Sequence, residues 1–205
     1  MLIFPDSNLT YLAVPKTGST AVEMALRPRA EIVFAKRRKH MNAQRYQSKV
    51  APFLAKTFGI ETETVAVMRD PVDQIRSWYK YRQRSEVSGQ ARSTGAMTFD
   101  DFVMAVTADE LPDYANIGSQ HNFLTNRKGC VKVDHLFAYE NQPAFLAFLS
   151  ERLRFQVVLK QKNVSPPIDA PLSEAALKVL KAARPEEFEL YAQLMAAGGR
   201  LDFRV

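Results

Sequence analysis

The sequence predicts an α/β fold in which a central, mainly parallel sheet is flanked by helices. Short apolar runs alternate with helix-like stretches along the first part of the chain. The clearest run, TVAVM at 64–68, is continuous and apolar, as is typical of a strand buried on both faces. Asp70-Pro71 follows directly, a capping residue and then a proline at the first helical position. Alternation of this kind indicates parallel strands joined by crossover helices.

The elements can be placed along the chain from these signals. Strands are expected at 11–14, 31–34, 64–68, 132–137 and 156–159. Helices are expected at 18–26, 43–58, 71–81, 99–106, 115–124, 143–153, 173–183 and 185–195. Gly59 should end the second of these helices as its C-cap. Residues 82–97 are polar, contain two glycines and lack periodicity, which indicates a loop that could cover a site.

Composition sets the class of protein. The 205 residues are 46% apolar and 24% charged, which is typical of a globular chain, and we expect one domain spanning 1–205. No apolar run approaches the roughly 20 residues that cross a bilayer, and the first residues do not resemble a secretory signal. The single cysteine, Cys130, excludes an intrachain disulfide and fits the cytoplasm. Three histidines and one cysteine are too few for a typical zinc site.

The chain is basic, with a net charge of +6 and a pI near 9.5. Much of the excess lies in two stretches, 36–39 and 76–84. Such a charge favours an anionic partner, which can be a nucleic acid, a nucleotide or an acidic substrate. Each stretch can equally be a solvated face of the fold.

The first candidate site is PKTGST at 15–20, which lies between a strand and a helix. The start of a helix presents unpaired N–H groups and the positive end of the helix dipole, and therefore binds anions. In this loop Gly18 allows close approach of the backbone, Thr17, Ser19 and Thr20 add hydroxyl groups, and Lys16 adds a positive charge. The nucleoside-triphosphatase loop GxxxxGK[ST] differs, because its lysine directly follows glycine. The alternative is an ordinary strand–helix turn.

The second candidate site lies in VAVMRDPVDQIRSWYKY at 65–81. Arg69 follows the buried strand at the sheet edge where open α/β folds bind ligands. Arginine grips a phosphate with two hydrogen bonds, and the hydroxyl of Ser77, two helical turns later, can add a third. Alternatively, Arg69 pairs with Asp70 or Asp73, and Ser77 simply lies on a helix surface.

Together, PKTGST and RDPxxxxxSxY resemble the nucleotide site of the sulfotransferases, in particular the bacterial and carbohydrate branch. SQHNFL (119–124), DHLFAYEN (134–141), NVS (163–165) and EEFELY (186–191) extend the resemblance over most of the chain. It implies a three-layer, P-loop-like fold and 3′-phosphoadenosine 5′-phosphosulfate (PAPS) as the sulfuryl donor. It assigns the phosphosulfate to Lys16, Thr17, Gly18, Ser19 and Thr20, and the 3′-phosphate to Arg69 and Ser77.

The chemistry of sulfuryl transfer suits these residues. A sulfonate carries less charge than a terminal phosphoryl group, so a lysine and N–H donors can replace a metal ion. We expect Lys16 to neutralise the leaving phosphate and His40 to act as the base that takes a proton from the acceptor. His40 lies in a basic run, and its alternative is an exposed surface residue. The acceptor is a small molecule or a glycan that supplies a hydroxyl or an amine.

Three other functions remain open at this stage. The same scaffold can serve a kinase-like phosphoryl transferase, which would need ATP and magnesium. It can also belong to a protein that binds a nucleotide without catalysis. The high pI allows a nucleic-acid-binding module, although the sequence contains no nucleic-acid motif.

Overall fold

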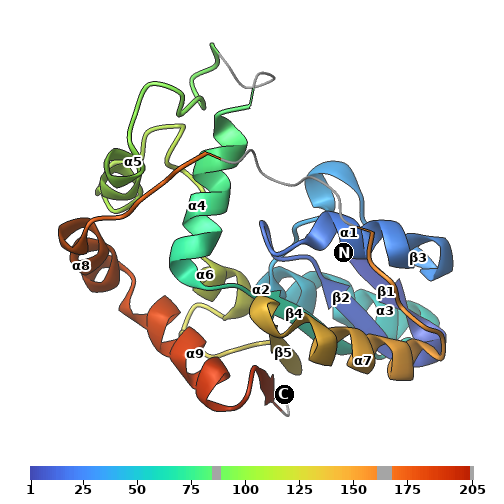
Figure 1. Ribbon diagram of the computed structural model, residues 1–205. Coiled ribbons are helices and arrows are strands. Elements are labelled where there is room, and N and C mark those ends of the chain that lie inside the picture. The colour runs from blue at the N-terminus through green and yellow to red at the C-terminus, as the bar shows by residue number, and fades with distance from the viewer. Residues whose placement is uncertain (85–88, 161–167, 204–205) are drawn as a thin grey trace.

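The computed structural model describes residues 1–84, 89–160 and 168–203 and has a six-stranded mixed sheet flanked by helices (Figure 1). The order of the strands in the sheet is β3-β1-β2-β4-β5-β6. The strands are β1 (Leu2–Phe4), β2 (Leu9–Leu12), β3 (Ile32–Val33), β4 (Glu63–Met68), β5 (His135–Ala138) and β6 (Arg200–Asp202). Pairing is parallel between β2, β4 and β5, and antiparallel at every other junction. The prediction of a mainly parallel sheet thus holds only for the three central strands.

The helices fill the intervals between these strands. Their bounds are α1 (Ser19–Leu26), α2 (Ala43–Arg45), α3 (Ala51–Phe58), α4 (Pro71–Arg82), α5 (Phe99–Val106), α6 (Gln120–Leu124), α7 (Gln142–Leu153), α8 (Glu174–Ala183) and α9 (Pro185–Ala196). Asp70 caps α4 as predicted, because its carboxylate accepts a hydrogen bond of 2.9 Å from the N–H of Asp73. Gly59 ends α3 in the left-handed conformation, also as predicted.

Apolar side chains from both faces of the sheet hold the helices in place. On one face α1 and α7 bring Val22, Leu26, Phe145 and Phe148 against strand residues such as Val65. On the other face α3, α6 and α9 pack against the alternate strand residues, including Ala66. The continuous apolar run TVAVM is explained by this packing, because each face of β4 contacts a separate apolar core.

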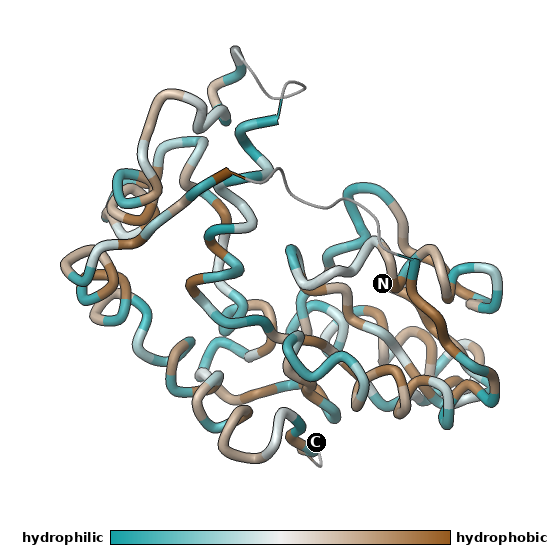
Figure 2. The backbone as a smooth tube through the Cα atoms, in the orientation of Figure 1, coloured by the Kyte–Doolittle hydropathy of each residue, from teal (hydrophilic) through white to brown (hydrophobic). Residues whose placement is uncertain are grey.

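A third apolar cluster joins α4 to α5 and α8, which lie on the side of α4 away from the sheet (Figure 1). Ile75 and Tyr79 of α4 are buried in it. Along α4 hydrophobic and hydrophilic stretches alternate (Figure 2), as expected for a helix with one face packed. Its remaining face is therefore free to contact the chain around PKTGST.

The strand predictions need several corrections, and the strand predicted at 132–137 is confined to His135–Ala138. The second strand begins and ends two residues before the predicted 11–14, because the chain turns where the N–H of Val14 donates to the carbonyl of Leu12. The stretch 156–159 is irregular, and its backbone is held by a side chain, Ser150 Oγ, at 2.9 Å from the N–H of Val157. The sequence reasoning missed β1, which lies between β3 and β2, and the edge strand β6; each has only three residues.

Two predicted helices also differ. The stretch 43–58 contains a π-helical turn at Tyr46–Val50, because Pro52 has no N–H to continue the regular ladder. Only Gln120–Leu124 of the predicted 115–124 is helical, since Gly118 has a φ of 71° and Ser119 caps the helix. Residues 82–97 are irregular beyond the end of α4 wherever they are described, and 85–88 lie outside the described residues.

The N-terminal ends of the central strands carry an ion-pair cluster. Glu63, at the start of β4, accepts hydrogen bonds from Arg152 and from His135 Nε2, the latter at 3.1 Å. These contacts, that with Arg152 first, lower the pKa of Glu63. His135 also contacts Asp202 through Nδ1, at 2.6 Å, so it has a structural role. Among the helices of the described residues, none has both the length and the apolar character that a bilayer crossing needs.

Candidate functional site: an anion-binding edge of the sheet

The C-terminal ends of β2, β4 and β5 lie side by side at one edge of the sheet, because these strands are parallel neighbours. The PKTGST loop leaves β2, Arg69 directly follows β4, and Tyr139 directly follows β5. The two segments that the sequence singled out, 15–20 and 69–77, therefore meet at this edge. In open α/β sheets such an edge is where ligands bind.

The PKTGST loop has a backbone that ordinary residues rarely adopt. Lys16 and Gly18 have φ values of 67° and 71°, and Gly18 stands immediately before α1 as its N-cap. The hydroxyl of Thr17 donates to the carbonyl of Val14 at 3.0 Å, which closes the turn. Ser19 is the buried first residue of α1. The first N–H groups of a helix have no partner within it, so the loop presents hydrogen-bond donors where α1 begins.

Tyr139 links the two predicted segments. A Cβ on Gly18 would stand 3.2 Å from Cε2 of Tyr139, so the ring lies against the loop backbone. The guanidinium carbon of Arg69 lies 4.7 Å from the centroid of the same ring. The ring of Tyr139 therefore contacts both the loop and Arg69.

Arg69 is held by its backbone, while its guanidinium is not paired with a carboxylate among the described residues. Gln120 accepts from the N–H of Arg69 and donates to its carbonyl, each at 2.9 Å. Arg69 Nε is buried and has no hydrogen-bond partner in the described part of the chain. The alternative pairings are not observed, because Asp70 caps α4 and Asp73 pairs with Arg76. A buried donor without a partner at a ligand-binding edge favours an anion there.

Lys16 packs against α4. Its Nζ lies 4.2 Å from the ring centroid of Tyr81 and 5.4 Å from that of Trp78. Burial, and then the positive charges of Arg84 and Arg69, lower the pKa of Lys16 to about 8. The charge of Arg69 is thus close enough to act on Lys16, although the two come from different strands. An anion between them would relieve this repulsion.

The other predicted residues lie around this centre. Ser77 is buried on α4, in the same helix as Trp78 and Tyr81. Thr20 accepts a hydrogen bond of 3.2 Å from Lys39, which also lies 2.7 Å from Glu23. These contacts tie the basic stretch 36–39 to α1.

His40 follows this stretch and lies on the other side of the loop. Its Nδ1–H donates to the carbonyl of Ala13 at 2.7 Å, because a carbonyl can only accept. Nε2 is then the basic nitrogen of the neutral ring. The residue is exposed to an open cavity, yet the atoms packed around its ring exclude enough water to lower its pKa. His40 is therefore neutral near pH 7 and can accept a proton.

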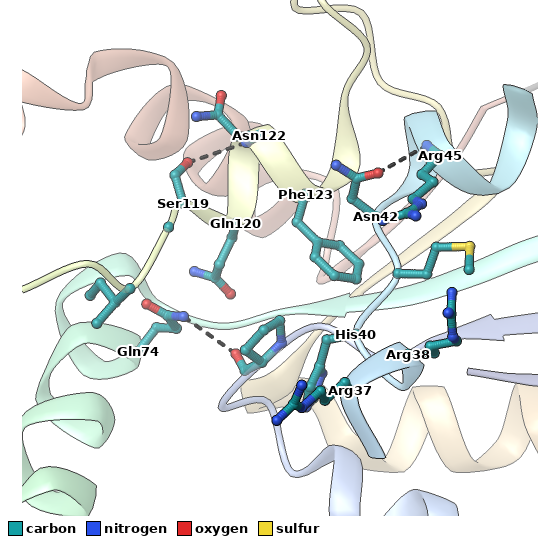
Figure 3. Close-up of a pocket in the computed structure, with 14 residues that line it drawn as sticks. Arg37, Arg38, His40, Asn42, Arg45, Gln74, Ser119, Gln120, Asn122 and Phe123 are labelled. Atoms are coloured by element: carbon teal, nitrogen blue, oxygen red, sulfur yellow. Dashed lines mark hydrogen bonds between the residues drawn. The ribbon is translucent and has the colours of Figure 1, made fainter. Parts of the chain in front are cut away.

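The cavity beside His40 has a volume of about 550 Å³ (Figure 3). Pro15 of the loop lines it, and Gln74 of α4 donates to the carbonyl of Pro15 at 3.3 Å. A smaller cavity of about 120 Å³ lies by Thr17, Gly18, Tyr139 and Lys160. The NVS landmark at 163–165 falls outside the described residues.

Sequence reasoning missed several residues of the site. Tyr139 lay inside a recognised stretch, DHLFAYEN, but carried no assigned role. Gln74 and Gln120 gave no signal, since an isolated glutamine has no characteristic spacing. Of the neighbouring aromatic residues Trp78 and Tyr79, Tyr79 is in the core and Trp78 contacts Lys16.

Among the described residues, no group of three or more His, Cys, Asp or Glu is placed to hold a metal ion. Comparisons with protein-family models, with curated proteins and with solved structures found no match to this chain.

Proposed function

We propose that the protein is a sulfotransferase that moves a sulfuryl group from PAPS to a hydroxyl or amine of an acceptor. The observation that carries the proposal is the convergence of the PKTGST loop, Tyr139 and Arg69 at one sheet edge, where Arg69 Nε has no hydrogen-bond partner among the described residues. The order of these segments matches the sulfotransferase motifs. The helices on both faces of the sheet support a three-layer, P-loop-like scaffold.

The donor would bind with its two anionic ends on the two segments. The phosphosulfate is assigned to the loop and the start of α1, where N–H groups, Ser19 and Thr20 provide donors. The 3′-phosphate is assigned to Arg69 and Ser77. Both ends are then held by groups that the fold positions in advance, which is the arrangement that stabilises charge in a transition state.

Lys16 would act on the leaving group. When sulfur transfers to the acceptor, negative charge develops on the bridging oxygen of the phosphate. A bound anion raises the pKa of Lys16 from about 8, so the lysine becomes fully protonated when its charge is needed. Its movement from the rings of Trp78 and Tyr81 towards the phosphate would supply that charge.

His40 would act on the acceptor. The ring is neutral near pH 7, and its Nε2 is the nitrogen that can accept a proton. Pro15 and His40 line the same cavity, so an acceptor there lies next to the loop. Proton removal from the attacking hydroxyl or amine is the step that this geometry supports.

Binding without metal tests the proposal against its rivals. Thermal unfolding is measured with adenosine 3′,5′-bisphosphate and EDTA, with ATP and magnesium, and with a DNA oligonucleotide. We expect the bisphosphate alone to stabilise the protein, by roughly 2.7 kcal/mol at a hundred times its Kd. Stabilisation only by ATP with magnesium would favour a kinase, and only by DNA a nucleic-acid-binding module.

Transfer of labelled sulfate from PAPS to a panel of acceptors then separates an enzyme from a protein that only binds the nucleotide. Lys16→Ala should bind the bisphosphate nearly normally and lose most of its turnover. Wild-type turnover in that variant would remove Lys16 from the mechanism.

A further inference from the structure

The outer side of α3 exposes two phenylalanine rings. Phe53 and Phe58 are 56% and 60% exposed, whereas every other phenylalanine that the structure describes is buried or half-buried. The two rings are in edge-to-face contact, with their centroids 5.7 Å apart. The inner side of the helix is anchored, because Leu54 is buried in the core on this face of the sheet. The rings thus form one joined apolar patch on a fixed support, unlike the scattered single apolar residues of an ordinary surface.

The segment that contains this patch is also strongly basic. Residues 32–60 hold seven of the chain's 28 lysines and arginines and none of its 22 acidic residues. The segment therefore carries a charge of +7, while the remaining 21 basic and 22 acidic residues leave the rest of the chain at −1. Lys39 pairs with Glu23, but none of the other six cations forms an ion pair within the described residues. Most of this charge is therefore available to an anionic partner.

Three of these cations lie along the same side of the helix as the rings. Lys49, Phe53 and Lys56 recur every three or four residues and are all exposed, so they share the outer side of the helix. Arg45, also exposed, precedes Lys49 by four residues, about one turn of the π-helical stretch between them. We call this surface, formed by Arg45, Lys49, Phe53, Lys56 and Phe58, the α3 face.

Charge and shape together select the occupant of the α3 face. A second copy of the chain would bring the same positive charges together, which costs free energy. A single-stranded nucleic acid needs a groove and open ring faces for its bases, whereas the edge of one ring here covers the face of the other, and neither ring lines a cavity described above. An anionic bilayer offers a broad charged surface for the cations and an apolar layer for the rings.

We propose that the α3 face docks the protein on membranes that contain anionic phospholipids. Phe53 and Phe58 enter the headgroup region and the upper acyl chains, and the three cations beside them contact the headgroups. Apolar insertion and electrostatic attraction are each weak, and together they give reversible binding at the surface of the bilayer. Because the cations are exposed, salt screens their part of the attraction. The proposal goes beyond sulfuryl transfer and does not depend on it.

Co-sedimentation with vesicles tests the proposal. The protein is mixed with vesicles of phosphatidylcholine alone, or of about one phosphatidylserine to three phosphatidylcholine molecules. A basic residue near an anionic leaflet changes the partition constant about fivefold, so three cations should favour the anionic vesicles by about a hundredfold at low salt. The preference should shrink at high salt.

Charge variants assign the preference to the α3 face. K49Q/K56Q should weaken binding to the anionic vesicles by about 25-fold, at about fivefold for each cation. K178Q/K181Q serves as the matched control, because it removes two exposed lysines from α8, which lies far from α3 (Figure 1). This control should bind the anionic vesicles like the wild type.

Apolar variants separate insertion from simple attraction of charges. F53A/F58A should weaken binding to the anionic vesicles by about tenfold or more, because two rings no longer leave water. M104A/L111A removes two side chains that are 48% and 43% exposed elsewhere on the surface, and should bind like the wild type. All of these substitutions replace exposed side chains, so each variant should keep a cooperative thermal transition.

The results that overturn the proposal are equally definite. They are a lack of binding to anionic vesicles, equal binding to both kinds of vesicle, or binding that survives in both K49Q/K56Q and F53A/F58A. The same variants are tested with a DNA oligonucleotide and for self-association in the ultracentrifuge. If F53A/F58A weakens one of these while the wild type ignores anionic vesicles, the α3 face binds nucleic acid or a second copy, and the membrane proposal is wrong.

Discussion

Replacing Lys16 by methionine should stabilise the free protein while removing the proposed sulfuryl-transfer activity. The ammonium of Lys16 is buried next to other positive charges, and its pKa falls to about 8 as a result. At pH 7 the folded protein therefore holds a charge that its surroundings disfavour. Methionine keeps the length of the side chain, has no charge and packs well against aromatic rings such as that of Tyr81.

The expected gain follows from the pKa. A fall from the ordinary 10.5 to about 8 corresponds to roughly 3 kcal/mol, because each tenfold change in acidity is worth about 1.4 kcal/mol. The contacts of the ammonium with Trp78 and Tyr81 offset about 0.5–2 kcal/mol of this. We therefore expect Lys16→Met to raise the free energy of unfolding by about 1–3 kcal/mol at pH 7.

The pH dependence provides the sharper test. The folded pKa is below the unfolded one, so the penalty is complete below about pH 8 and is relieved as the pH rises towards 10.5. In urea denaturation, the difference in free energy of unfolding between Lys16→Met and the wild type should narrow by roughly 2 kcal/mol between pH 7 and pH 9.5. Lys16→Gln serves as the control for loss of charge and should behave alike. A difference in free energy of unfolding that is constant with pH, or a variant less stable than the wild type at pH 7, would refute the reasoning.

Three further predictions concern the loop, the aromatic contact and the opposite edge of the sheet. Gly18→Ala should lower the free energy of unfolding in urea by about 1 kcal/mol or more, because a φ of 71° disfavours a side chain and Tyr139 is only 3.2 Å from the added carbon. The variant should also bind the bisphosphate more weakly in titration. Unchanged affinity would contradict this. Trp78 is the only tryptophan, so the fluorescence of the protein should change when the bisphosphate draws Lys16 away from its ring. The change should be smaller in Lys16→Met. An identical change in the two proteins argues against movement of Lys16. The lowered pKa of Glu63 stabilises the folded protein at pH values above 4.5, the ordinary pKa of the group, and this stability is lost as the pH falls through the folded pKa. The urea midpoints of the wild type and Glu63→Gln should therefore differ at pH 7 and converge in acid.

The fold was predictable where local signals and burial agree. The run at 64–68 is apolar because both sides of β4 are covered, and Asp70-Pro71 marks the start of α4 through its own chemistry. The strands β1 and β6 gave weaker signals, since each has three residues and owes its form to pairing with a strand far away in the sequence or across a turn. Tertiary pairing of this kind leaves no periodic pattern to detect.

The site was predictable only in part, for a similar reason. Lys16, Gly18 and Arg69 lie in turns between a strand and a helix, where backbone conformation favours glycine and an anion site favours positive charge. Tyr139 and Gln120 act through contacts between elements that are distant in the chain, the first on Gly18 and Arg69 and the second on the backbone of Arg69. No spacing rule connects such residues before the sheet brings them together.

The cost of burying Lys16 bears on how the site selects its ligand. In the free protein the ammonium faces aromatic rings and the charges of nearby arginines, and Arg69 Nε has no partner among the described residues. We expect both groups to gain favourable contacts when an anion with two charged ends binds at this edge. A ligand with one anionic end would pair with either Lys16 or Arg69 and leave the other without a ligand contact. The site should therefore discriminate strongly between adenosine 3′,5′-bisphosphate and adenosine 5′-monophosphate, and the free energy released at both ends would position Lys16 for the transfer.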